Sequence, residues 1–391
     1  MTYISRMSDT HRHIRPAATV LAILFVLQAA HATAGDAAPW RLSGVEGLPA
    51  RLALSGHQRI RYEALDGQFR SAYAGRDQLL ALRTALKATV ALDGLALTAE
   101  IMDSRQALAD DGTPLGTSMV NTLEMLQAHL SVDLGLRGCL LAGRHTMDLG
   151  SRRLVARNRF RNTINNFTGL NGTWTGSDGR TVRAFFVLPV DRLPSERARL
   201  RDNEVQIDRE DWDVRFWGVQ AARPGVLADA AGEFYLFGLH ESDTPARPTR
   251  NRRLLTFGGR LDRKPAPACC DFELEAALQF GESRASLSDA DVTDLDHAAH
   301  FLHLAGGYTF DRAWAPRVVL QFDLASGDTD PSDAENNRFD TLYGARRFEY
   351  GPTGIYGVFA RANIVSPGWR AIVKPRRALN VMRAHRLHWL G

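Results

Sequence analysis

Hydrophobic residues recur at every second position along much of this 391-residue chain. In the run Asp271–Phe280, the even positions are Phe, Leu, Ala, Leu and Phe, whereas the odd positions are Asp, Glu, Glu, Ala and Gln. The runs Leu80–Val90, Met125–Leu134 and Arg317–Leu324 alternate in the same way. A period of two places successive side chains on opposite faces of a β-strand, and no helical stripe in the chain is as sustained. The sequence therefore predicts an all-β protein.

Short and long connections alternate between these runs. Asp93-Gly94 is a two-residue hairpin turn, and Gly135–Gly138, Asp311–Pro316 and Ser366–Gly368 also indicate short connections. Longer polar segments cover about residues 64–76, 105–120, 189–210, 241–250, 282–297 and 326–354. About 16 runs of roughly 9–11 residues are visible, and tilted strands of that length cross a bilayer. The pattern predicts a transmembrane antiparallel up-and-down β-barrel, with short turns on the periplasmic side and long loops outside.

The hydropathy of the chain excludes a helical membrane protein, which needs runs of about 20 apolar residues. Mean hydropathy is -0.23, and the one long apolar run is Ala17–Ala30. Arg6, Arg12 and Arg15 precede this run, and the small residues Ala32-Thr33-Ala34 follow it, which is typical of a secretory signal peptide. The predicted organisation is a signal peptide over residues 1–34, a short N-terminal periplasmic segment over residues 35–50 and a barrel over residues 51–391.

Arginine dominates the basic residues. The chain has 48 Lys and Arg against 44 Asp and Glu, a formal net charge of +4, and only three of the basic residues are Lys. A GC-rich genome favours Arg, but the planar guanidinium also binds carboxylates in a bidentate manner. The three cysteines, Cys139, Cys269 and Cys270, form neither a disulfide framework nor a metal-binding spacing.

The alternation assigns side chains to two environments. The apolar face meets lipid, and the charged face lines a water-filled lumen. Strand parity places these residues in the lumen: Arg59, Arg61, Glu63, Arg83, Lys87, Gln127, His129, Asp213 and Arg215. Aromatic residues near the ends of the runs fit the interfacial girdles of a barrel, with core aromatics of a soluble β protein as the alternative: Trp40, Tyr62, Trp212, Tyr308, Trp314, Tyr343, Tyr350 and Trp369.

Five stretches, taken together, carry a family resemblance. They are RIRYE at Arg59–Glu63, AEIMDSR at Ala99–Arg105, LAGRHTMDLGSRRLVARNRFRNT at Leu141–Thr163, FDLASGD at Phe322–Asp328 and NRFDTLY at Asn337–Tyr343. The set resembles the alginate export family of outer-membrane barrels over about residues 50–391. Its most specific part runs from Gly143 to Thr163.

The resemblance implies a monomeric barrel of about 18 strands. Such barrels carry an anionic uronate polysaccharide, or other solutes, through an Arg-rich constriction. Residues that match the family segment are added to the predicted substrate-binding set: Arg144, Asp148, Arg152, Arg153, Arg157 and Arg159. Arg144 has the strand parity of Leu140 and Ala142, so it reaches the lumen only if a bulge at Gly143 re-aims it.

The C-terminal end departs from the family. The visible runs are about two fewer than the implied count, a difference comparable with the error of boundary prediction. The chain ends at His388–Gly391 inside a predicted strand, whereas barrels of this class usually end in an aromatic residue that the assembly machinery recognises. A truncated C-terminus and a shifted reading frame are the two explanations.

No sequence motif predicts a cofactor. G-x-S-x-G, P-loop and H-E-x-x-H motifs are absent. Five carboxylates close together in the sequence suggest an acidic loop: Asp323, Asp328, Asp330, Asp333 and Glu335. Within it, Asp328, Asp330 and Asp333 are a weak calcium candidate. The spacing fails the EF-hand pattern, so a solvated loop is the favoured interpretation. Three histidines follow one another at a spacing of three residues: His297, His300 and His303. In a strand this spacing sends neighbouring side chains to opposite faces, so it does not favour a metal site.

Three functions fit the sequence. The favoured one is a passive channel in the outer membrane of a Gram-negative bacterium, through which an anionic, alginate-like polysaccharide or a related acidic solute passes. The alternatives are a secreted periplasmic all-β enzyme that processes polysaccharide, which paired carboxylates could support, and a structural barrel with a plugged lumen. The expected partners are anionic polysaccharide, outer-membrane lipid, the barrel assembly machinery and periplasmic secretion components, with no nucleic acid.

Overall fold

A computed structural model describes residues 49–391 except 71–72, 74, 228, 246, 289, 347, 352 and 377. The predicted signal peptide and almost all of the predicted periplasmic segment, together with Trp40, lie outside the described residues. None of the helices in the described part is long and apolar enough to cross a membrane.

The described residues form 16 β-strands. They are β1 (Leu52–Asp66), β2 (Arg76–Leu92), β3 (Leu95–Ala107), β4 (Asn121–Gly135), β5 (Gly138–His145), β6 (Phe167–Thr175), β7 (Thr181–Pro189), β8 (Val214–Leu227), β9 (Ala230–Glu241), β10 (Arg253–Arg263), β11 (Cys269–Ser283), β12 (Leu295–Thr309), β13 (Arg317–Ala325), β14 (Glu335–Asn336), β15 (Ile364–Arg376) and β16 (Leu379–Arg386). Among the described residues there are also three short helices: α2 (Arg197–Arg201), η2 (Phe348–Tyr350) and η3 (Gly354–Tyr356).

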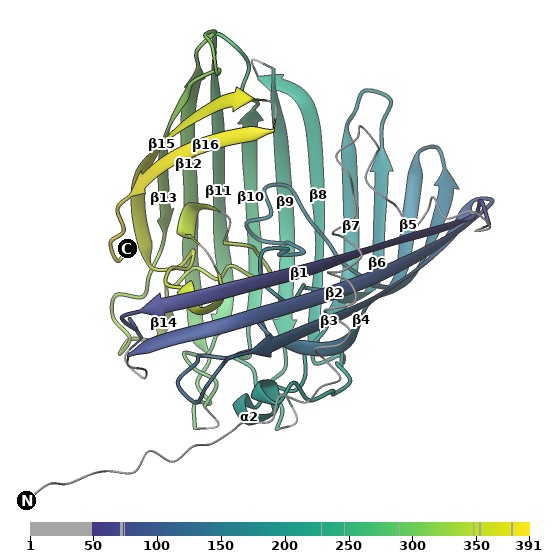
Figure 1. Cartoon of the computed structure of the whole chain (residues 1–391), viewed down its shortest axis with the longest axis vertical. Helices are drawn as coiled ribbons and strands as arrows, with labels where there is room; N and C mark the ends of the chain where they lie inside the picture. Colours follow the sequence, from purple (N-terminus) through teal and green to yellow (C-terminus); the bar gives the residue numbers. More distant parts are fainter. Residues whose placement is uncertain are drawn as a thin grey trace, which may run out of the picture.

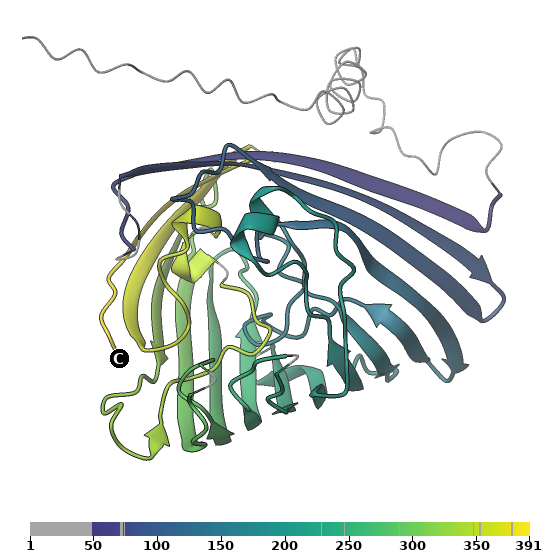
Figure 2. The same ribbon diagram turned by 90° about the horizontal axis from the view of Figure 1, so that it is seen from below.

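Every long strand pairs antiparallel with its neighbour in the chain. The order runs from β1 to β13 and then to β15 and β16, while β14 lies off this path and pairs parallel with β12. The sheet curls round into a barrel wall that encloses several connecting segments (Figures 1 and 2). Within the described residues, no backbone pairing joins β1 to β16. The all-β, up-and-down prediction is confirmed.

The connections alternate in length, as the sequence predicts. Two residues, Asp93 and Gly94, join β2 to β3, whereas the connection from β5 to β6 covers residues 146–166. The long connections include the one with α2, which lies at the lower end of the barrel in Figure 1. The prediction of a turn at Ser366–Gly368 is wrong, since these residues lie within β15 and pair with β13.

The two faces of the sheet differ as a membrane barrel requires. In β13, Leu320 is 67% exposed on the outside, whereas Val319 and Asp323 on the other face are 1% and 0% exposed. Exposed apolar side chains occur on the outer face of most strands, among them Ile60, Leu86, Leu97, Leu170, Phe186, Phe234, Leu278 and Val381. This face suits contact with acyl chains.

A bulge in β4 changes the face of one predicted lipid contact. The register between β3 and β4 shifts where Glu100 pairs with Gln127 and Ile101 with Met125, so Leu126 is the extra residue. Leu126 is 0% exposed and packs inside the barrel with Ile164. The alternation in Met125–Leu134 predicts that Leu126 faces lipid, and this prediction is wrong, because an extra residue reverses the parity of a strand.

The largest apolar cluster lies inside the barrel. Phe167, Phe185, Phe216 and Phe237 point inward from β6 to β9. The rings of Phe167 and Phe216 contact Tyr343, which lies in the connection between β13 and β15. Tyr350, in the same connection, is 2% exposed. Tyr343 and Tyr350 are therefore core residues of the filled lumen, and their prediction as girdle residues is wrong.

Candidate functional site

Two connections fold into the barrel and divide its interior. We call residues 146–166, between β5 and β6, the first inner segment, and residues 337–363, between β13 and β15, the second inner segment. Both lie inside the curved sheet when the barrel is viewed along its opening (Figure 2). Irregular backbone of this kind is tolerated at membrane depth where it is buried in protein or lines a water-filled cavity.

The first inner segment is held by opposite walls. At one side, Arg153 Nη1 lies 2.6 Å from Glu273 Oε1 in β11. At the other side, Arg59 Nη2 donates to the carbonyl oxygen of Arg161 at 2.6 Å, and Arg83 Nη1 donates to the same oxygen at 3.1 Å. The segment therefore spans the lumen from β11 to β1 and β2.

The second inner segment is held by the wall and by the first segment. The amide of Ile355 donates to Glu63 Oε2 in β1 at 2.8 Å. The amide of Ala156, in the first inner segment, donates to the carbonyl of Tyr343 at 3.1 Å. These bonds fix the position of the two segments relative to each other.

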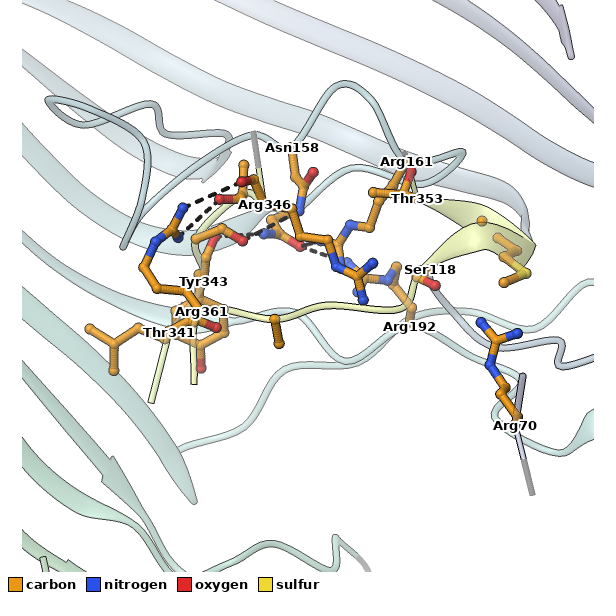
Figure 3. Close-up of a pocket in the computed structure, with 18 residues that line it drawn as sticks. Arg70, Ser118, Asn158, Arg161, Arg192, Thr341, Tyr343, Arg346, Thr353 and Arg361 are labelled. Atoms are coloured by element: carbon orange, nitrogen blue, oxygen red, sulfur yellow. Dashed lines mark hydrogen bonds between the residues drawn. The ribbon is translucent and has the colours of Figure 1, made fainter. Parts of the chain in front are cut away.

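Two adjoining cavities lie along the inner segments. The larger encloses about 530 Å³, and Figure 3 shows the residues that line it. The second encloses about 410 Å³ and shares Asn158, Ala345, Arg346 and Thr353 with the first. We call the space that the two cavities form the arginine passage, because seven arginines line it: Arg70, Arg152, Arg159, Arg161, Arg192, Arg346 and Arg361.

The passage has a large excess of positive charge. Asp148 is the one carboxylate among its described lining residues, and it lies 3.6 Å from Arg159. The other six guanidiniums make no ion pair within the described residues. Those with hydrogen bonds donate to neutral groups, as Arg192 does to the carbonyl oxygen of Thr117 at 3.0 Å. A bound anion would supply the missing negative charge.

The crowding of charge changes the acidity of these groups. Burial, and then the positive charges of Arg192 and Arg346, lower the pKa of Arg161 to about 9. Burial and the charge of Arg70 also lower the pKa of Arg346. With its pKa at about 9, Arg161 stays protonated at neutral pH, but burial and the neighbouring charges destabilise the charged forms of both groups. An anion in the passage would therefore be attracted strongly.

Some predicted site residues reach the passage, and others fix the inner segments. Asp148, Arg152 and Arg159 line it. Arg153 is fully buried against three glutamates, and Arg157 Nη2 lies 2.8 Å from Glu100 Oε1.

The remaining predicted residues that face the interior are Arg59, Arg61, Glu63, Arg83, Lys87, Gln127 and His129. Arg59, Arg61 and Arg83 donate to backbone carbonyls of the first inner segment.

Two predicted lumen residues lie on the outer face. In the register of β5 and β6, Arg144 lies opposite Thr168, and the next residues, His145 and Phe167, point into the barrel. Arg144 therefore points outward, where it forms an ion pair with Glu210. The bulge proposed at Gly143 therefore does not re-aim it.

Arg215 also lies on the outer face, because its neighbours Val214 and Phe216 are 2% and 0% exposed inside the barrel. Strand parity assumed that the polar side chain faces inward, but the interior here is a packed apolar cluster. Asp213 precedes β8 and accepts from Thr244 Oγ1 at 3.4 Å.

Five arginines of the passage were missed from the sequence: Arg70, Arg161, Arg192, Arg346 and Arg361. Each lies in a connection, where strand parity makes no prediction. Arg161 belongs to the family segment that ends at Thr163, and this is the one sequence signal that could have found it.

The acidic residues of the weak calcium candidate do not gather around one point. Asp330 accepts from the hydroxyl of Ser332 at 2.5 Å, and Asp333 accepts from the amide of Glu335 at 2.8 Å. Asp323 belongs to β13 and is fully buried beside His303. Among the described residues, no group of three or more His, Cys, Asp or Glu side chains is placed to hold a metal ion. The weak calcium candidate at Asp328, Asp330 and Asp333 stays a prediction.

The curled antiparallel sheet, its apolar outer face and its charged passage define a β-barrel channel of the outer-membrane porin type. Two solved structures share this fold. OccAB1 of Acinetobacter baumannii has a TM-score of 0.55 and 11% identity, over 89% of this chain and 82% of that chain. OccK11 (OpdR) of Pseudomonas aeruginosa has a TM-score of 0.51 and 13% identity, over 86% of this chain and 78% of that chain.

The model of the alginate export family matches residues 50–391, and the chain belongs to this family. A comparison with curated protein sequences finds no match. Family and fold make the protein an outer-membrane transport channel, as the sequence predicts, and they point away from the alternative of a secreted enzyme.

Proposed function

We propose that the protein is a passive channel for acidic solutes of the uronate type, including alginate-like polysaccharide, and that the arginine passage selects them. The observation that carries the proposal is the imbalance of charge in the passage, where seven arginines face one carboxylate. Rings of Arg and Lys are the usual selectivity device of pores for anions.

The arrangement of the arginines suits a solute with several carboxylates. Arg70 lies at one side of the larger cavity and Arg361 at the other (Figure 3). Arg152 and Arg159 continue the series in the second cavity. A carboxylate could pass from one guanidinium to the next, and no single strong site would hold it. Conduction requires binding that is favourable but weak at each of several sites.

The test is the reversal potential of single channels in a planar bilayer with a salt gradient. The wild type should prefer chloride to potassium, and oligomers of a uronic acid should block the current. Arg346→Gln removes a charge that both cavities share, so it should weaken the preference and the block. Arg215→Gln is the matched control, since this arginine lies on the outer face.

A cation preference in the wild type would refute the proposal. So would equal reversal potentials for Arg346→Gln and Arg215→Gln. Block by neutral sugars at the same concentration as the uronate oligomers would show that shape, and not charge, controls entry.

A plugged structural barrel is the second candidate, because the inner segments and the aromatic cluster fill much of the lumen. It predicts no resolvable conductance in the same bilayers. Correct folding can be checked separately by the difference in gel mobility between unheated and boiled samples in detergent, so the two candidates are distinguishable.

A further inference from the structure

A group of buried oxygen atoms lies at the start of β4. Asn121 and Thr122 are 0% exposed and Glu124 is 4% exposed, whereas Leu123 between them is 58% exposed. Leu123 has a φ of 57°, and the pairing with β3 is irregular here. This local break in the alternation directs three polar side chains in four residues into the protein.

Most oxygen atoms of these side chains have no partner. The side chain of Asn121 acts on Glu124 as a hydrogen-bond partner, but neither carboxylate oxygen of Glu124 meets strict hydrogen-bond geometry, and neither Asn121 Oδ1 nor Thr122 Oγ1 has a partner. An ionised carboxylate that is removed from water without a partner is strongly disfavoured. Unsatisfied buried groups of this kind call for an ion or another ligand.

A second carboxylate lies beside the first. Asp208, in the connection between β7 and β8, is 7% exposed. Its Oδ2 accepts from the side-chain amide of Asn121 at 2.8 Å, and its Oδ1 accepts from the amide of Leu193 at 2.9 Å. The charge of Asp208 also acts on Glu124 through space.

The neighbouring guanidiniums do not neutralise Glu124. Arg192 and Arg144 act on it through space, but their hydrogen bonds go elsewhere. Arg144 pairs with Glu210, and Arg192 donates to backbone carbonyls and to the side chain of Asn165. The group therefore consists of acceptor oxygens from two carboxyl groups, one amide and one hydroxyl.

We propose that Glu124, Asp208, Asn121 and Thr122 form a calcium site. Calcium takes six to eight oxygen ligands from carboxylates, side-chain carbonyls and water in flexible geometry, whereas magnesium keeps most of its water. Carboxylate and amide oxygens in a buried position with irregular backbone fit calcium better.

The site would connect β4 to the connection that carries Arg192, which lines the arginine passage. Bound calcium would therefore tie a part of the passage to the barrel wall. This inference goes beyond the proposed function, since it holds whether or not uronates pass.

Binding can be measured by equilibrium dialysis of radioactive calcium against protein that has been refolded in detergent without lipopolysaccharide. The wild type should bind about one calcium per chain, in the affinity range of extracellular sites. Glu124→Gln should weaken binding by roughly tenfold or more. Glu196→Gln is the matched control, because this carboxylate lies in the same connection as Asp208 and is 62% exposed.

Calcium should also raise the unfolding temperature of the wild type and of Glu196→Gln, and EDTA should reverse the rise. Absence of saturable binding by the wild type would overturn the proposal. Equal binding by wild type and Glu124→Gln, or equal stabilisation by magnesium and by calcium, would also overturn it. Loss of calcium binding in Asp330→Asn but not in Glu124→Gln would overturn it as well. If Glu124→Gln fails to refold, Asp208→Asn takes its place.

Discussion

Arg153 attaches the first inner segment to the barrel wall and to the second inner segment. Its side chain is 0% exposed, and its guanidinium lies 2.6 Å from Glu273, 2.7 Å from Glu275 and 2.8 Å from Glu349. Burial lowers the pKa of Arg153, but the charges of Glu349, Glu275 and Glu273 outweigh burial and raise the pKa well above its ordinary value. The guanidinium is therefore charged at neutral pH.

Arg153→Ala should destabilise the protein by about 3–5 kcal/mol, the typical cost of removing one partner from a buried ion pair. The change leaves three carboxylates close together, and the side chain of Glu275 is only 2% exposed. Unfolding in urea, followed by tryptophan fluorescence of refolded protein, measures the loss. Single channels should also show a larger and less steady conductance, since the first inner segment loses its ion pairs with β11 and keeps only the hydrogen bond from Ser151 to Glu275.

Arg180→Ala is the control, because Arg180 pairs with Asp178 in an exposed turn, where both side chains are more than 40% exposed. It should cost less than about 1 kcal/mol. Adding Glu275→Gln to Arg153→Ala should restore part of the lost stability, since it removes one uncompensated charge. If Arg153→Ala is as stable as Arg180→Ala, the reasoning about the buried cluster is refuted.

Three further predictions concern the wall and the second inner segment. Leu126→Ala should cost about 2–5 kcal/mol in urea unfolding, because this side chain packs inside the barrel, whereas Leu123→Ala, at an exposed position, should cost little; equal losses would contradict the bulge. Leu320→Arg should cost up to about 2–4 kcal/mol in lipid vesicles, depending on depth, and no loss would contradict its placement against acyl chains. Burial raises the pKa of Asp340, but Arg252 outweighs burial and the pKa is lowered overall. Asp340 therefore contributes stability above its unfolded pKa of about 3.9, and this contribution is lost as the pH falls through the lower folded value. Wild-type stability should fall more steeply below about pH 4 than that of Asp340→Asn, and parallel curves would contradict the shift.

The sequence predicts the wall of the barrel well, because strand period and turn chemistry are local properties. The alternation in Arg317–Leu324 corresponds to β13, with Leu320 outside and Asp323 inside. The hairpin at Asp93-Gly94 joins β2 to β3. These features depend on neighbouring residues alone, so no tertiary information is needed.

The interior is predicted less well, because it depends on segments that are distant in the sequence. The assignment of polar side chains to the interior from strand parity assumes a water-filled lumen. Phe216, however, faces inward against Tyr343, and Arg215 consequently faces outward. The first inner segment carries the family resemblance, but its fold into the lumen depends on contacts with β1, β2 and β11. Arg192 and Arg346 meet in the passage only through such contacts.

The central claim is that the passage holds an uncompensated positive potential, and cysteine modification can measure it directly. Thr341 is a neutral residue that lines the larger cavity. Thr341→Cys is made in a protein whose Cys139, Cys269 and Cys270 are changed to Ser. A small anionic thiol reagent should then react at least roughly tenfold faster than its cationic counterpart at low ionic strength, and the ratio should fall as salt is added. Equal rates at low salt, or faster reaction of the cationic reagent, would contradict the account.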